Sequence, residues 1–253
     1  MYLDIHAHFA EEGYDIPAEW ERIVAAGVKK VVLAGDTAAH SRMHRDLADR
    51  YEGLYFAAGV HPSEAERLPA DALEEIGALC AHPKCVALGE IGLDYHWDTP
   101  DRRAQQALFS AQLELADRLA LPVQIHSRDC FADMLAILRE RRTLLSRGFL
   151  MHCYSHGAAH LDDFAALGAY FSFGGVACFK NAANVWESVR ACPADRLLSE
   201  TDSPYLSPFR GEKNTPANIP VIVARLAQLR GEDAGALAAQ IAKNAETLFP
   251  KLG

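Results

Sequence analysis

The chain has 253 residues, of which 50% are hydrophobic and 23% are charged, and its formal net charge at pH 7 is −9. This composition excludes an intrinsically disordered chain, and the counts of 17 glycines, 12 prolines and 6 cysteines exclude a collagen-like chain and a disulfide scaffold. The excess of Asp and Glu excludes a protein that coats a polyanion along a broad basic face, so a nucleic-acid substrate would have to be held at a local site.

The cysteines and the N-terminal sequence give expectations about the cellular setting. The six cysteines form no CxxC pair, and a chain of this length needs no disulfide to fold, so we expect reduced thiols. The sequence MYLDIHAHF has no basic region followed by an apolar run. No apolar stretch approaches the roughly 18 residues that span a bilayer. We expect a cytoplasmic protein with no membrane association and no obligate protein partner.

A short apolar run followed by a helical pattern recurs along the chain. The eight runs are Tyr2–His8, Lys29–Gly35, Leu54–His61, Val86–Gly92, Pro122–His126, Phe149–Cys153, Ala169–Phe173 and Leu197–Asp202. Their starts lie roughly 28 residues apart, close to the ~30 expected when about 250 residues are divided among eight βα units. Between the runs, apolar residues recur at helical spacing, for example over residues 104–119, 131–138 and 237–248.

This alternation predicts an α/β fold, a single (β/α)8 barrel of the TIM type with its active site at the C-terminal ends of the strands. A doubly wound open sheet is the competing architecture. The count of eight runs with no segment left over favours the barrel. Because no change in composition divides the sequence, we expect one domain over residues 1–253.

The first run carries two histidines at alternate positions. Asp4, His6 and His8 alternate with apolar residues. Alternate residues of a strand share a face, so both imidazoles point the same way and can hold one metal ion. A pair of hydrogen-bonded core histidines would give the same pattern.

Four other runs end in residues that are typical metal ligands. Because the C-terminal ends of parallel barrel strands meet at one mouth, these side chains are expected to converge with the two histidines. Each alone would suit a structural role. The four are Glu90, His126, His152 and Asp202.

Six such ligands exceed the needs of a single catalytic zinc, which takes three protein ligands and a water. They suit two divalent ions about 3.5–4 Å apart. We expect His6, His8 and Asp202 to hold one ion and His126 and His152 the other, with Glu90 as the bridge. Imidazole and carboxylate ligands suit Zn²⁺, Mn²⁺ or Mg²⁺, which leaves the metal open.

The motifs in order along the chain resemble the TatD family of metal-dependent hydrolases from Met1 to about Phe249. They are LDIHAH, GVHP, GEIGLDY, LPVQIHSRD, HCYS, SFGG, ETDSPYL and RGEKN. The resemblance implies an amidohydrolase-like barrel and a metal-dependent deoxyribonuclease, typically a 3′–5′ exonuclease acting on DNA. By motif position, the family's metal ligands fall on the same six residues. Two places depart from the family pattern, His156 and the segment Phe9–Asp15, and both are expected to rim the pocket.

Further residues near the strand ends are candidates for binding substrate. Structural explanations exist for each of them, such as a turn, a helix cap or a solvated charge. The candidates are His61, Asp94, Tyr95, Arg128 and Lys180, with Arg210 and Lys213 on the Pro-rich segment Ser203–Pro220. His40 and His44, at helical spacing, are expected to face solvent, and Cys153 is expected to face the core, away from His152.

The expected reaction is hydrolysis of a phosphodiester by a metal-activated hydroxide. Asp202 would act as general base and Glu90 as the bridging catalytic carboxylate, while Arg128 or Lys180 would offset developing charge. The same metal site could hydrolyse an amide or ester, such as an aminoacyl ester of tRNA. A non-catalytic metal-binding protein is the third alternative. The sequence has no GxSxG, HExxH, P-loop or GxGxxG motif.

Overall fold

The computed structural model describes residues 1–9 and 15–253. Within them, eight strands form one parallel sheet in the order β1 to β8, and each strand is bonded to the next along the chain. The strands are β1 (Tyr2–Ala7), β2 (Val28–Ala34), β3 (Leu54–Ala58), β4 (Cys85–Asp94), β5 (Val123–Arg128), β6 (Phe149–Met151), β7 (Ala169–Phe173) and β8 (Leu197–Ser199).

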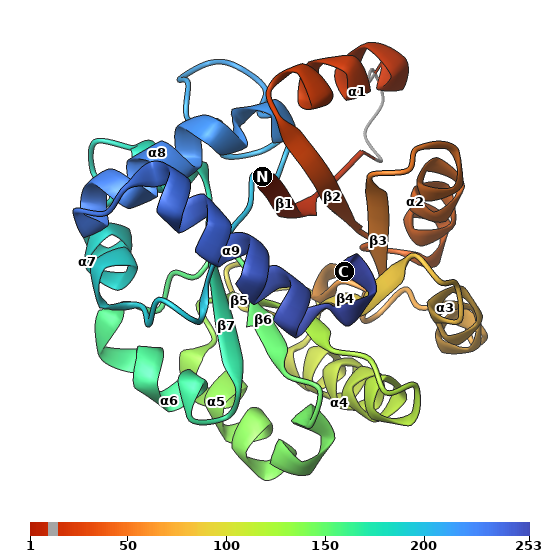
Figure 1. Cartoon of the computed structure of the whole chain (residues 1–253). Coiled ribbons are helices and arrows are strands. Elements are labelled where there is room, and N and C mark those ends of the chain that lie inside the picture. The colour runs from red at the N-terminus through yellow and green to blue at the C-terminus, as the bar shows by residue number, and fades with distance from the viewer. Residues whose placement is uncertain (10–14) are drawn as a thin grey trace.

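Helices separate successive strands and surround the sheet (Figure 1). They are α1 (Ile16–Ala25), α2 (Ala38–Arg50), α3 (Ala72–Cys80), α4 (Arg102–Arg118), α5 (Phe131–Glu140), α6 (Leu161–Ala165), α7 (Ala183–Ala191), α8 (Ile219–Arg230) and α9 (Ala234–Leu248). The predicted helical stretches correspond to α4, α5 and α9. Two helices, α8 and α9, follow the last strand, where a simple eightfold repeat has one.

The sheet closes on itself just beyond β8. The amide of Asp202 donates to the carbonyl of His6 at 2.9 Å, and the amide of His8 donates to the carbonyl of Ser203 at 2.7 Å. These bonds join the segment after the last strand to the first strand. The predicted parallel (β/α)8 barrel is therefore confirmed, and the open sheet is not the architecture.

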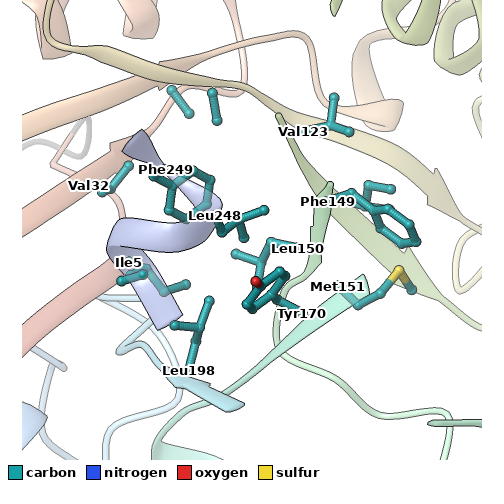
Figure 2. Packing of buried hydrophobic residues seen from close by; sticks show 14 of the residues in the cluster. Ile5, Val32, Val123, Phe149, Leu150, Met151, Tyr170, Leu198, Leu248 and Phe249 are labelled. Carbon is teal, nitrogen blue, oxygen red and sulfur yellow. The ribbon is translucent and has the colours of Figure 1, made fainter. Parts of the chain in front are cut away.

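The strands form because their apolar side chains are buried on both faces, which is typical of parallel sheets covered by helices. All ten residues of β4 are buried. The N-terminal end of the barrel is covered by the C-terminal segment: Asn244 in α9 donates to the carbonyl of Leu197 at 2.9 Å, and Lys251 donates to the carbonyl of Cys85 at 2.8 Å. Figure 2 shows Leu248 and Phe249 among the core side chains of the strands. The C-terminal segment thus covers one end of the barrel, and a functional site can lie at the other, where the strands have their C-terminal ends.

The strands start close to the predicted positions, but several end earlier. The last predicted residues of the first, sixth and eighth runs, His8, Cys153 and Asp202, lie beyond β1, β6 and β8. At Cys153 and Asp202 the backbone takes positive φ values of 44° and 55°, which strand geometry does not allow. The chain thus leaves the strand and turns at the mouth of the barrel. None of the helices in the described ranges has the length and apolar character that crossing a bilayer requires.

Gly92 allows β4 and β5 to approach closely beneath the site. A Cβ atom at Gly92 would lie 2.0 Å from the carbonyl oxygen of His126, and its φ is +146°. We expect Gly92→Ala to lower the free energy of unfolding by about 2–3 kcal/mol, measured by urea denaturation. The control is Gly168→Ala, where φ is also positive but no atom lies within 4 Å of the added Cβ. Its expected cost is about 1 kcal/mol, and equal costs for the two variants would contradict the steric explanation.

Candidate metal centre

The six predicted ligands lie together at the C-terminal end of the barrel. Five of them line a cavity of about 770 Å³, and the sixth, His6, lies fully buried directly beneath it. They come from β1, β4 and β5 and from the segments just after β1, β6 and β8. The lining ligands are His8, Glu90, His126, His152 and Asp202.

Glu90 stands between two pairs of imidazoles. Its Oε2 lies 3.5 Å from His6 Nε2 and 3.6 Å from His8 Nε2. Its Oε1 lies 2.8 Å from His126 Nδ1 and 2.8 Å from His152 Nε2. Each oxygen of one carboxylate therefore faces its own pair of ring nitrogens, which is the arrangement of a bridging ligand.

Asp202 adds a second carboxylate to the first pair. Its Oδ1 lies 3.3 Å from His8 Nε2 and 3.8 Å from His6 Nε2. The positive φ of Asp202 turns its side chain toward these rings just past β8. Asp tolerates this backbone conformation better than most residues, because its short polar side chain bonds locally.

The far nitrogens of the first pair are held by acceptors. His6 Nδ1 lies 3.1 Å from Gln124 Oε1, while the amide nitrogen of Gln124 donates to the carbonyl of Ile5. His8 Nδ1 lies 3.0 Å from the carbonyl of Ala34. Because carbonyl oxygens only accept, both Nδ1 atoms carry the proton. The Nε2 lone pairs of His6 and His8 then face each other 3.2 Å apart.

The second pair has carboxylates behind it. His126 Nε2 lies 3.0 Å from Asp94 Oδ2, which leaves Nδ1 facing Glu90. His152 Nδ1 is buried without a hydrogen bond and lies 3.7 Å from Glu200 Oε2. Carboxylates and carbonyls behind metal-bound histidines fix the ring and its tautomer. Gln124 and Glu200 lie in such positions behind His6 and His152, and the sequence analysis did not select them.

The donor set fits divalent cations. Two lone pairs that face each other at 3.2 Å need a positive charge between them. Atoms that each lie about 2.1 Å from one ion are at most about 4.2 Å apart, and the nitrogen–nitrogen and nitrogen–carboxylate distances of both pairs are within this span. In the part of the chain that the structure describes, three overlapping groups could hold an ion: His6 with His152 and Asp202, His6 with His8 and Glu90, and His61 with Glu90 and His126.

The electrostatics of the site favour anionic carboxylates. Burial alone would raise the pKa of Glu90, but the nearby His152 and His6 and the hydrogen bond from His126 hold it well below its usual range. Burial and the neighbouring His152 lower the pKa of His6, so this ring is neutral and can coordinate. Burial would also lower the pKa of His8, but Asp202 and Glu90 outweigh it and raise that pKa to about 9. The carboxylates thus attract positive charge, which protons or cations can supply.

The structure places three of the five predicted substrate-binding residues on the cavity wall. They are His61, Asp94 and Arg128. Tyr95 is directed elsewhere, because its hydroxyl donates to Asp133 at 2.8 Å. Lys180 is exposed beyond β7 and is not on the wall. The structure does not bring these two residues to the cavity wall, and their role in substrate binding stays a prediction. Of the segment Phe9–Asp15, residues 10–14 lie outside the described part.

Two further expectations, on His44 and Cys153, need correction. His44 does not face solvent: it is fully buried, and the amide of Phe9 donates to its Nε2 at 3.4 Å. The side chain of His40 is partly exposed, as expected, but it pairs with Asp36, and both line the cavity. Cys153 also lines the cavity, because its positive φ ends the alternation of the strand.

Comparison with known proteins identifies the family of this chain. The family described as TatD related DNase matches residues 3–250. The chain belongs to this TatD family. It is 37% identical to an uncharacterized metal-dependent hydrolase, YabD of Bacillus subtilis, over 98% of this chain and 99% of that protein. It is 36% identical to the 3′-5′ ssDNA/RNA exonuclease TatD of Klebsiella pneumoniae, over 90% and 89% of the two chains.

A solved structure shows the same fold. The TatD homologue YJJV from Escherichia coli superposes with a TM-score of 0.93 at 33% identity, covering 98% of both chains. The resemblance predicted from the motifs is confirmed, and with it the hydrolase class.

Proposed function

We propose that this TatD-family chain hydrolyses phosphodiester bonds of nucleic acid, releasing nucleotides from the 3′ end of single-stranded DNA. The observation that carries the proposal is the position of Glu90, one buried carboxylate with a separate pair of imidazoles at each oxygen. A relative named as a 3′-5′ ssDNA/RNA exonuclease supports the choice of substrate.

The six residues divide between two cation positions. His6, His8 and Asp202 would hold one, His126 and His152 the other, and Glu90 would join them. Divalent cations bound there, whether Mg²⁺, Mn²⁺ or Zn²⁺, lower the pKa of a bound water and polarise a phosphoryl oxygen.

Asp202 is the residue proposed to take the proton. Burial would raise the pKa of its carboxyl, but the contact with His8 and the nearby imidazoles lower it, so the carboxyl is ionised and has lone pairs to accept a proton. Its Oδ1 faces the first pair, and the side chain also borders the open cavity, where an attacking water would arrive. Arg128, on the same wall, is placed to offset charge that develops on the phosphate.

The carboxylates on the cavity wall give a second test. The described lining carries the carboxylates of Asp36, Glu90, Asp94 and Asp202 against the single guanidinium of Arg128. Carboxylates repel a phosphate unless positive charge offsets theirs, and divalent cations, unlike protons on the imidazoles, also bind phosphate oxygens directly. We expect chelation to weaken binding of a phosphorothioate single-stranded oligonucleotide at least about tenfold, measured by fluorescence anisotropy, and readdition of Mn²⁺ to restore it. Equal affinity with and without metal would contradict the proposed role.

The activity is tested on chelated protein to which Mg²⁺, Mn²⁺ or Zn²⁺ is returned. Single-stranded DNA, duplex DNA and an aminoacyl ester are offered side by side. We expect stepwise shortening of the single strand from its 3′ end. Cleavage of the ester alone would replace the proposed nuclease by an ester hydrolase on the same site, and no cleavage of any substrate would reject both.

A further inference from the structure

One hydroxyl on the cavity wall has no part in the roles described above. Ser127 follows His126 on β5, precedes Arg128 and lines the cavity. Its Oγ lies 2.7 Å from Nε2 of His156. A serine held by a histidine beside a candidate metal ligand is well placed to touch the substrate, so the direction of its proton is important.

A neighbouring thiol limits the possible directions of that proton. Ser127 Oγ lies 3.2 Å from Cys130 Sγ, and Cys130 Sγ lies 3.3 Å from the carbonyl of Leu93. The carbonyl only accepts, so the single proton of Cys130 is used there. The thiol therefore cannot donate to Ser127, and its sulfur is only a weak acceptor for the hydroxyl proton.

His156 is held in place as a neutral ring. Its centroid lies 5.7 Å from that of Phe131 and 5.8 Å from those of Tyr154 and Phe164. Burial and the nearby His160 lower its pKa to about 4, so one ring nitrogen carries a proton at neutral pH. If Nε2 were bare, Ser127 would donate to it and show only lone pairs to the cavity, which repel a phosphate. If Nε2 carries the proton, the hydroxyl proton of Ser127 is available to the cavity.

We propose that Ser127 donates a hydrogen bond to a phosphate oxygen of the substrate, next to Arg128, and that His156 is a positioning residue whose Nε2–H donates to Ser127. The inference rests on the proposed nuclease function. It gives His156, a departure from the family pattern, a role in setting the polarity of the cavity wall. Ser127 is then a substrate-binding residue, and His156 acts only through it.

A double-mutant cycle tests the coupling. Ser127→Ala is expected to lower kcat/KM for single-stranded DNA about tenfold, since it removes a hydrogen bond to a charged group. His156→Phe keeps the ring among its aromatic neighbours but removes Nε2, and a similar loss is expected. In the Ser127→Ala background, His156→Phe should cost almost nothing more. If the two losses add, or if Ser127→Ala loses nothing while the unmodified chain cleaves DNA, the inference is overturned and the proposed function is not. An inactive unmodified chain would instead reject the proposed function.

A measurement without turnover gives an independent test. ¹⁵N NMR of the imidazoles in the full chain is expected to show the His156 proton on Nε2, and a bare Nε2 would overturn the inference even if His156→Phe folds poorly. The matched control is His160→Phe. His160 also packs on Phe131, with ring centroids 3.9 Å apart, but its Nδ1 lies 3.4 Å from Asp163 Oδ2 and it does not bond to Ser127. It should leave kcat/KM unchanged, whereas a loss equal to that of His156→Phe would show that only packing is measured.

Discussion

Replacing Glu90 with glutamine is expected to lower kcat for single-stranded DNA by about 10³-fold or more. The amide is neutral, and one of its two terminal atoms becomes an NH₂ group with no lone pair to offer. One of the two imidazole pairs, His6 with His8 or His126 with His152, would then no longer face a carboxylate oxygen. The measurements are kcat and the bound metal per chain by elemental analysis.

The control for this variant is Glu19→Gln. Glu19 is also a buried glutamate, but it bonds to Thr215 and Arg22, away from the imidazoles. It should retain activity and metal content. Circular dichroism should show that both variants fold. If the Glu90 variant kept the activity and metal content of the unmodified chain, the bridging role would be rejected.

Asp202→Asn should lower kcat by about 10²–10⁴-fold, the range typical of a lost general base. The amide cannot accept the proton that the carboxylate is proposed to take, and it weakens the attraction for positive charge beside His8. A rise in KM much smaller than the fall in kcat would place the effect in the chemical step. The comparison variant is Asp36→Asn, another carboxylate on the wall, which bonds to His40 and should keep most of kcat. Full activity in the Asp202 variant would reject the general-base assignment.

The barrel and the clustering of the six side chains could be predicted because both depend on simple periodicities. Eight buried strands in parallel array require near-continuous apolar runs, so a polar residue at the end of a run stands out. His6, Glu90 and His126 are such polar residues in apolar strands. The barrel brings the C-terminal ends of all its strands to one mouth, where these side chains meet. The division of the six residues into two groups stays a prediction: Glu90 lies between the two pairs, but His6 also groups with His152 and Asp202.

The residues behind the ligands could not be predicted, because their contacts join distant strands. Gln124 bonds to His6 across 118 positions of the sequence, and no local pattern signals that pairing. Glu200 stands two residues before Asp202 but lies behind His152, a neighbour only in the closed barrel. The structure alone shows which nitrogen of each ring faces the carboxylates of Glu90 and Asp202.

The errors have a local cause, which is the turn of the chain at the barrel mouth. Strand alternation predicts that Cys153 faces away from the cavity, but its positive φ reverses the side chain. The helical spacing of His40 and His44 suggests an exposed stripe, yet the helix begins at the mouth and one histidine is buried against Phe9. The periodicity of a sequence predicts which side chains share a face of a helix or strand, but not which other parts of the chain pack on that face.

The central claim is that six side chains from distant parts of the chain hold two cations at one end of the barrel. Anomalous X-ray diffraction from crystals grown with Mn²⁺ measures this directly. We predict two peaks about 3.5–4 Å apart, one beside His6 and His8 and the other beside His126 and His152, with Glu90 between them. The absence of any peak in this cavity, or strong peaks only elsewhere on the protein, would contradict the account.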